Sequence, residues 1–343
     1  MKIVLTLDYE LFFGQKTGSV SKSIVDATER LVTVLDEFNI KAVFFVDVGF
    51  LKQLDYYRSD HPELEKDYQL ISDQLKQLSN EEHDLQLHVH PHWEDSRYHD
   101  GKWKIDAKRY KLSDWSTERV DDIVTEYKGI LEQFAINNSV FAYRAGGFCI
   151  QPFDKIKAAL KKNDIWLDST VFEGGGNESK THSFSFQNMP SQSEWKFGDD
   201  PLEVDENGNF LEIPISSCRV SPLFYWKLAL TRLMKDSRHQ SFGDGNSLPK
   251  TKKWLIKKLT IPSTICASID GFKVTRLNKA FVQEKREHPD GNFVIIGHPK
   301  ALTEYSLNEF RKFIANNISD HTFCTFSELL ANEIIRHPKN THV

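Results

Sequence analysis

Short apolar runs, each followed closely by polar or charged side chains, alternate with helix-like stretches along this 343-residue chain. Runs typical of buried strands begin at Lys2, Lys41, Asp84, Phe141, Trp166 and Asn292. Stretches with helical periodicity, such as residues 23–36 and 116–134, fall between them. Strands and helices that alternate in this way predict an α/β barrel, in which the strand ends converge on one mouth. We therefore expect the side chains that follow the runs to meet at a single site.

Three histidines, His88, His90 and His92, lie within five residues directly after the run 84–87. If the chain stays extended, His88 and His90 share one face of the strand. Pro91 then bends the chain, so that His92 can turn back toward His88 as a loop ligand. Two neutral imidazoles, one carboxylate and open water positions are typical of a hydrolytic zinc centre. A histidine-rich turn that is merely solvated is the alternative, and the apolar neighbours disfavour it.

Two acids, Asp8 and Glu10, end the first run, and three further polar residues end later ones. One acid can serve as a metal ligand and the other as a general base, although a helix cap is equally consistent with this pair. The later residues are Arg144, Asp168 and His298. Taken singly, each of these three has an ordinary interpretation: a surface ion pair, a helix cap, or a buried histidine bonded to backbone. Their common position at strand ends indicates a shared site.

Taken together, these residues resemble the ordered motifs of the polysaccharide deacetylase family, also called the NodB-homology or family 4 carbohydrate esterases. The matching motifs are Thr6-Leu-Asp8-Tyr-Glu10, His88-x-x-x-His92, Tyr143-Arg144-Ala-Gly-Gly147, Leu167-Asp168-Ser169 and Ile296-Gly297-His298. The resemblance covers residues 1–175 and 290–330 and is loose between them. It implies a distorted (β/α) barrel that hydrolyses an acyl group on a sugar with the help of one divalent metal ion.

The resemblance also implies a ligand set for that ion. His88 and His92 occupy the positions that bind metal in the family pattern. The first motif departs from the usual pair of adjacent aspartates, because Tyr9 follows Asp8. The next carboxylate, Glu10, therefore becomes the expected third ligand. Zinc is the ion that we favour for this set.

The remaining motif residues receive catalytic roles from the same resemblance. Asp8 would be the general base, and Arg144 would pair with it and keep it ionised. His298 would protonate the leaving amine, with Asp168 as its orienting partner. These roles agree with the chemistry of amide hydrolysis, which needs an acid and a base held in different protonation states.

Composition favours a single enzyme domain over residues 1–343. With 39% hydrophobic and 27% charged residues, the chain can build one sizeable core. No apolar run approaches the roughly eighteen residues of a membrane span, and no secretory signal precedes the first strand. We therefore expect a cytoplasmic protein without nucleic-acid partners. The four cysteines are scattered and are expected to be reduced core residues: Cys149, Cys218, Cys266 and Cys324.

The segment 219–258 differs from the rest of the chain in charge. It holds ten Lys or Arg residues against two Asp, a net charge of plus eight, whereas the whole chain has a formal charge of minus five. Ser221 and Pro222 predict the start of one helix, and a second basic stretch begins at Lys252. We interpret residues 219–290 as a mainly helical, partly basic insertion in the barrel. Its basic face is either solvated or contacts an anionic membrane or a substrate diphosphate.

These observations predict a metal-dependent hydrolase that removes an acetyl or formyl group from the nitrogen of an amino-sugar unit. The expected substrate is a nucleotide-linked or lipid-linked precursor in cell-surface glycan or glycolipid biosynthesis, and the enzyme would work in the cytoplasm or at the inner face of the membrane. Two alternatives stay open: a metal-free amidohydrolase of small cyclic amides, and an inactive barrel that only binds glycan.

Overall fold

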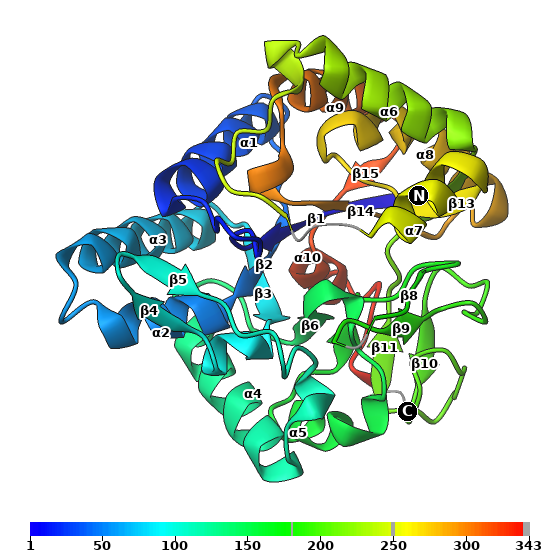
Figure 1. Ribbon diagram of the computed structural model, residues 1–343. Helices are drawn as coiled ribbons and strands as arrows, with labels where there is room; N and C mark the ends of the chain where they lie inside the picture. The colour runs from blue at the N-terminus through cyan, green and yellow to red at the C-terminus, as the bar shows by residue number, and fades with distance from the viewer. Residues whose placement is uncertain (180, 248–250, 339–343) are drawn as a thin grey trace.

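The computed structural model describes residues 1–179, 181–247 and 251–338. Its centre is a curled nine-stranded sheet with helices around it (Figure 1). The strands, in their order across the sheet, are β10 (Trp195–Phe197), β11 (Phe210–Glu212), β7 (Leu167–Asp168), β6 (Ala142–Ala145), β3 (Asp84–Val89), β2 (Val43–Asp47), β1 (Lys2–Tyr9) and β14 (Asn292–Gly297), with β15 (Thr322–Phe323) paired to the start of β1. Only the pair of β10 and β11 is antiparallel within the described sheet.

Backbone hydrogen bonds connect the two ends of this sheet into a distorted barrel. Beyond β11, the Ser216 nitrogen donates to the Val294 carbonyl at 3.0 Å. The Ala267 nitrogen donates to the Ser216 carbonyl at 2.7 Å, and the Ile296 nitrogen donates to the Ala267 carbonyl at 2.9 Å. The predicted fold class, a distorted (β/α) barrel, is confirmed.

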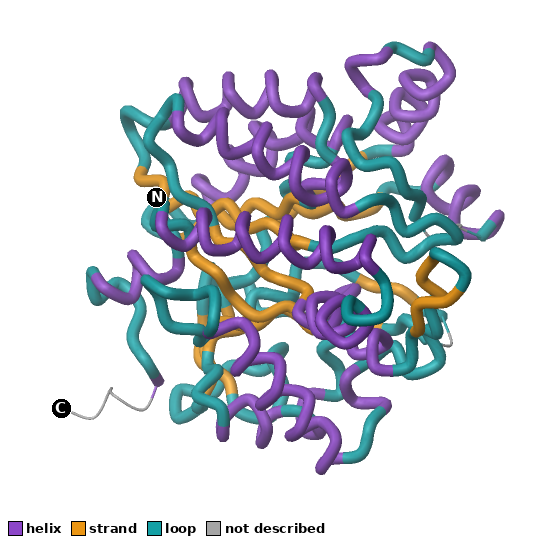
Figure 2. Tube along the Cα trace, turned by 90° about the vertical axis from the view of Figure 1, so that its left-hand side faces the viewer, coloured by secondary structure: helices purple, strands orange, loops and turns teal. Residues whose placement is uncertain are grey.

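Helices cover the outside of the strands, as Figure 2 shows in purple around orange. They are α1 (Asp26–Asp36), α2 (Val48–Tyr57), α3 (Pro62–Asn80), α4 (Thr117–Glu132), α5 (Lys157–Lys162), α8 (Leu277–Glu287), α9 (Glu304–Asn317) and α10 (Phe326–Ala331). Local sequence explains where several of them begin: the Ser116 side chain accepts from the Arg119 nitrogen at the start of α4. The helices predicted over residues 23–36 and 116–134 are confirmed as α1 and α4, with shorter ends.

The segment predicted to be an insertion lies between β11 and β14. It contains β12 (Ser217–Val220), α6 (Pro222–Met234), the short helix η6 (Ser237–His239), α7 (Lys252–Thr260), β13 (Ser263–Cys266) and η7 (Gly271–Arg276). β12 and β13 pair as an antiparallel ribbon, and Ser268 forms a bridge to Ile296 of the sheet. The expected insertion 219–290 is therefore helical in large part, but residues 267–269 within it belong to the barrel. Pro249 and Lys250 of the expected basic stretch lie outside the described residues.

Burial follows the predicted strand pattern. From Ile3 onward every residue of β1 is buried, and β2, β3 and β14 are buried along their whole length. Parallel strands that are covered on both faces need apolar side chains on both sides, and their sequences are therefore continuous apolar runs. The polar residues come where the strands end, so they leave the core together on one side of the barrel. No helix among residues 1–179, 181–247 and 251–338 is long and apolar enough to cross a membrane.

Candidate metal and active site

The carboxyl ends of five neighbouring strands bring the polar residues into one row. The register places Leu7 beside Gly297, Asp47 beside His88, and His88 beside Arg144. As a result, side chains from distant parts of the sequence lie around one point, and those involved are Asp8, Glu10, Asp47, His88, His90, Arg144 and His298. All of them except His298 are buried.

Glu10 is the centre of this cluster. Its Oε2 lies 2.6 Å from His90 Nε2 and 3.3 Å from His88 Nε2. Its Oε1 accepts a hydrogen bond from Lys300 Nζ at 2.8 Å. The ligand atoms of Glu10, His88 and His90 all lie within 4.8 Å of one another, and those of Asp8, Glu10 and His298 form a second such group. These are the groups of potential metal ligands found among the described residues.

The hydrogen bonding of the two histidines fits a metal site. The Nδ1–H of His88 donates to the Arg144 carbonyl at 2.9 Å, so Nε2 is the ring nitrogen that faces Glu10. Burial lowers the pKa of His90 to about 4, and this ring is therefore neutral near pH 7. Glu10 Oε2, His88 Nε2 and His90 Nε2 are buried without a hydrogen-bond partner in the described structure, although they face one another. One divalent cation would satisfy all three atoms.

His92 lies apart from this group. It belongs to the short helix η2 (Pro91–Glu94), and its ring stacks on Tyr110 at 5.4 Å with an interplanar angle of 4°. The His90 ring is 5.2 Å away. Pro91 starts the helical turn and so separates His92 from the strand face that His88 and His90 share. Of the predicted ligands, the structure thus brings Glu10 and His88 together and adds His90, whereas His92 is in neither ligand group.

Gly146 explains how the His90 ring fits beside the sheet. A Cβ atom at this position would lie 2.6 Å from His90 Nδ1 and 2.6 Å from the Val89 carbonyl oxygen. Real Cβ atoms do not approach so closely, so only glycine leaves room for the ring. The first glycine of the Arg-Ala-Gly-Gly motif therefore serves the candidate metal site.

Asp8 and Arg144 form the predicted ion pair. Arg144, which is fully buried, donates from a terminal nitrogen to Asp8 Oδ1 at 2.8 Å and to Thr6 Oγ1 at 2.9 Å. Its Nε donates to the Ser169 carbonyl at 2.7 Å. Burial alone would raise the pKa of Asp8, but Arg144, with His88 and His298, holds that pKa well below its usual range. The carboxylate is therefore ionised at neutral pH.

His298 faces the same carboxylate from the other side. Its Nε2 lies 3.4 Å from Asp8 Oδ2, and its Nδ1 lies 3.0 Å from Asp270 Oδ2. The His298 backbone nitrogen also donates to Asp270 Oδ1 at 2.8 Å. Burial would lower the pKa of His298, but Asp270 and Asp8 raise it to about 10. The imidazole is therefore protonated at neutral pH.

Asp270, and not Asp168, is the carboxylate that bonds His298. Asp168 accepts hydrogen bonds from the hydroxyl and the backbone nitrogen of Thr170 at 2.7 and 3.1 Å. The Thr170 hydroxyl in turn accepts from the Ala145 nitrogen at 3.0 Å, so Asp168 supports the strand that carries Arg144. A sequence signal for Asp270 exists, because an apolar run ends on Asp270-Gly271 as the other strand runs end on their site residues. It was missed because that run lies within the stretch interpreted as a helical insertion.

Two further residues next to Glu10 were not predicted. Lys300 bonds Glu10, and it is buried despite its charge. Asp47 ends β2 beside His88 and accepts from Trp93 Nε1 at 2.6 Å. Burial raises the pKa of Asp47 to about 7, because the nearby His88 only partly offsets it. Asp47 directly follows the apolar run 41–46, and this position at a strand end could have identified it as a site residue.

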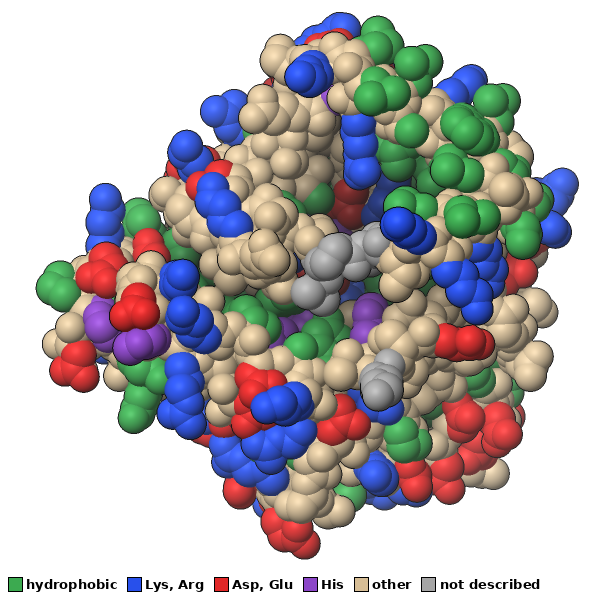
Figure 3. Space-filling view, viewed as in Figure 1, with side chains coloured by type: hydrophobic (Ala, Val, Ile, Leu, Met, Phe, Trp, Pro, Cys, Tyr) green, Lys and Arg blue, Asp and Glu red, His purple; other side chains and the backbone are tan. Residues whose placement is uncertain are grey.

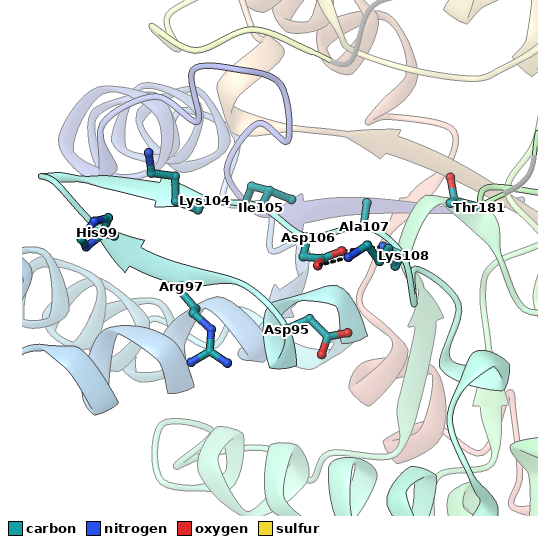
Figure 4. Close-up of a pocket in the computed structure, with 9 residues that line it drawn as sticks. All are labelled: Asp95, Arg97, His99, Lys104, Ile105, Asp106, Ala107, Lys108 and Thr181. Atoms are coloured by element: carbon teal, nitrogen blue, oxygen red, sulfur yellow. Dashed lines mark hydrogen bonds and ion pairs between the residues drawn. The ribbon is translucent and has the colours of Figure 1, made fainter.

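An open hollow on the surface, with a volume of about 750 Å³, lies apart from these residues. Figure 4 shows that it follows the hairpin of β4 (Arg97–His99) and β5 (Lys102–Lys104). Its lining mixes charges of both signs: Asp95, Arg97, His99, Lys104, Ile105, Asp106, Ala107, Lys108 and Thr181. None of the clustered site residues lines it, so we place the chemistry in the buried cluster.

No family model and no curated protein matches the sequence. Solved structures do resemble the fold. A Mycobacterium smegmatis protein assigned to the polysaccharide deacetylases is 15% identical with a TM-score of 0.48, over 98% of this chain and 91% of that chain. A family 4 acetyl xylan esterase from Clostridium thermocellum, solved with a cobalt ion, is 10% identical with a TM-score of 0.41, over 99% and 96%. Puue allantoinase is 11% identical with a TM-score of 0.47, over 99% and 91%. The similarity is one of fold, and it includes the family that the sequence motifs resemble.

Proposed function

We propose that this chain is a metal-dependent hydrolase that cleaves the amide bond of an N-acylated amino sugar. The observation that carries the proposal is the buried set Glu10, His88 and His90 beside an ionised Asp8 and a protonated His298. The three ligands fit zinc, which prefers imidazole and carboxylate donors. When bound, such an ion makes a water molecule acidic near neutral pH and stabilises negative charge on the carbonyl oxygen.

The other residues supply the proton transfers. Asp8 Oδ2 accepts the proton of the attacking water, while Arg144 keeps the opposite oxygen, Oδ1, in place. His298 Nε2 donates a proton to the leaving amine, and Asp270 holds the other ring nitrogen. Because the environments of Asp8 and His298 shift their pKa values in opposite directions, one is a base and the other an acid at the same pH.

The substrate class rests on the motif resemblance. We propose an acetyl or formyl group on an amino-sugar unit, carried by a nucleotide or a lipid during the synthesis of a surface glycan. A cytoplasmic location is part of the proposal, and it is supported by the four cysteines, all within the described residues, which form no disulfide.

Lys300 favours one alternative, a metal-free amidohydrolase. Its ammonium group lies 2.8 Å from Glu10 Oε1 and already offsets the charge of a carboxylate that a metal ion on Oε2 would otherwise neutralise alone. A metal analysis of the purified protein separates the two functions, combined with acetate and formate release from nucleotide-linked and lipid-linked amino sugars before and after treatment with a chelator. Hydrolysis that survives complete removal of metal would refute the metal-dependent mechanism.

A further inference from the structure

Helices α6 and α7 present a broad apolar surface to solvent. The exposed large hydrophobic side chains of this region, here called the apolar face, are Leu223, Trp226, Leu230, Leu233, Met234, Leu255, Ile256 and Ile261. Each of them is at least 47% exposed, and Leu233 reaches 77%. Monomeric proteins rarely leave large contiguous apolar patches uncovered unless a partner or a membrane contacts them.

The spacing on α6 shows that this exposure is organised. Leu223, Trp226, Leu230 and Leu233 follow one another at intervals of three and four residues, which places them along one side of the helix. Phe224 is the buried residue of α6, and its ring lies 5.6 Å from that of Phe272. The helix is therefore attached to the barrel through its other side, and the apolar stripe is directed outward.

The two helices are also attached to each other. Trp226 Nε1 donates to the Leu259 carbonyl at 3.2 Å, and the Tyr225 and Trp254 rings lie 6.5 Å apart. Lys258 Nζ lies over the Tyr225 ring at 5.4 Å. These contacts hold α6 and α7 as one unit, so the apolar face is a defined surface of the folded chain.

Positive charges border the apolar face. Six exposed cations occur on or directly after the two helices: Lys227, Arg232, Lys235, Lys252, Lys253 and Lys257. Among the cations of residues 221–247 and 251–262, only Arg238 forms an ion pair, with Asp236. This arrangement leaves a cationic border available for an anionic partner.

The apolar face lies beside the entrance to the candidate site. Figure 3 shows green hydrophobic side chains gathered over α6 and α7, next to a central hollow in which histidine is visible. The loop that follows α6 passes close to the site, because the Gly243 nitrogen donates to the carbonyl of Lys300 at 3.2 Å. A surface docked on the apolar face would therefore lie near the mouth of the barrel.

We propose that the apolar face docks onto an anionic lipid bilayer. The leucines, isoleucines and Trp226 would enter the boundary between headgroups and acyl chains, while the lysines contact lipid phosphates. A second copy of the chain fits less well, because a symmetric dimer through this face would bring two like-charged borders together. The proposal concerns only this surface and does not depend on the hydrolase activity.

Co-sedimentation of the full chain with vesicles tests the docking. We expect binding to vesicles of phosphatidylcholine mixed with phosphatidylglycerol, and weak binding to phosphatidylcholine alone. Replacing Lys252, Lys253 and Lys257 by Gln should lower the partition coefficient about 100-fold at low salt, since each basic residue near an anionic surface contributes roughly 5-fold. Replacing Leu230 and Leu233 by Ser should lower it by about 10-fold or more, since both side chains would be withdrawn from the membrane.

Matched controls come from other exposed residues. Lys102→Gln with Lys104→Gln and Lys108→Gln removes three charges elsewhere, and Ile136→Ser with Val282→Ser removes two exposed apolar side chains. Neither control should change vesicle binding. The docking proposal is overturned if the unmodified chain does not bind anionic vesicles, or if the controls reduce binding as much as the α6 and α7 variants. A dimer in light scattering that Leu230→Ser with Leu233→Ser dissociates would also overturn it, in favour of self-association.

Discussion

The comparison of His90 with His92 is the sharpest test of the candidate metal site. His90 Nε2 lies 2.6 Å from Glu10 Oε2, whereas His92 stacks on Tyr110 outside the ligand groups. We therefore expect His90→Ala to lose zinc and His92→Ala to keep it. Loss of residues that merely support a metal ligand costs about 10- to 100-fold in affinity, so loss of a ligand itself should cost at least about 100-fold.

Two measurements detect the loss of zinc from a variant. Competition with a chromophoric chelator gives the zinc affinity of each variant directly. Zinc at about 100 times its dissociation constant should stabilise the unmodified chain by about 2.7 kcal/mol. This stabilisation against thermal unfolding should persist in His92→Ala and fall to about 0.4 kcal/mol or less in His90→Ala. His88→Ala serves as the reference for loss of a ligand. Zinc binding that survives in His90→Ala and disappears in His92→Ala would contradict the ligand set and support the histidine spacing of the family motif.

Three further predictions concern catalysis and packing. Asp8→Asn should keep zinc but lose most turnover, because its proposed role is proton transfer; zinc analysis with steady-state rates checks this, and full activity would refute the role. Asp270→Asn should shift the alkaline limb of the pH–rate profile to lower pH. The reason is that Asp270 helps to raise the pKa of His298 to about 10, and His298 acts as an acid only below that pKa. An unchanged alkaline limb would show that the contact with Asp270 does not set the pKa of the catalytic acid. Gly146→Ala should weaken zinc binding by displacing the His90 ring, and a zinc affinity equal to that of the unmodified chain would show that the ring has room to move.

The parts of the fold that the sequence predicts are those with strong local signals. The runs 2–7, 41–46 and 292–297 became β1, β2 and β14 because continuous apolar sequence needs burial on both faces. These strand assignments depend on periodicity and on the common direction of parallel strands, and both can be read along the chain. The ion pair of Asp8 with Arg144 was instead expected from the resemblance to the family motifs, and it is present in the structure.

The parts that could not be predicted depend on distant backbone. Residues 267–269 form too short a run to be recognised as barrel structure before their partner, β14, is known, and Asp270 was missed with them. The choice between His90 and His92 depends on how tightly the chain turns after Pro91 and on the space left by Gly146. Neither quantity is encoded in the spacing of the histidines.

The position of α6 and α7 in the chain has a consequence for how such proteins diverge. The segment that holds both helices leaves the barrel at Ser216 and returns at Ala267, where the two backbones are joined by a hydrogen bond of 2.7 Å. An insertion whose ends meet can change in length or composition at little cost to the rest of the fold, apart from the loop around Gly243, which bonds back to Lys300 of the barrel. Helices α6 and α7 can therefore vary during evolution, and the exposed surface of the chain varies with them, while the residues of the candidate site stay in register.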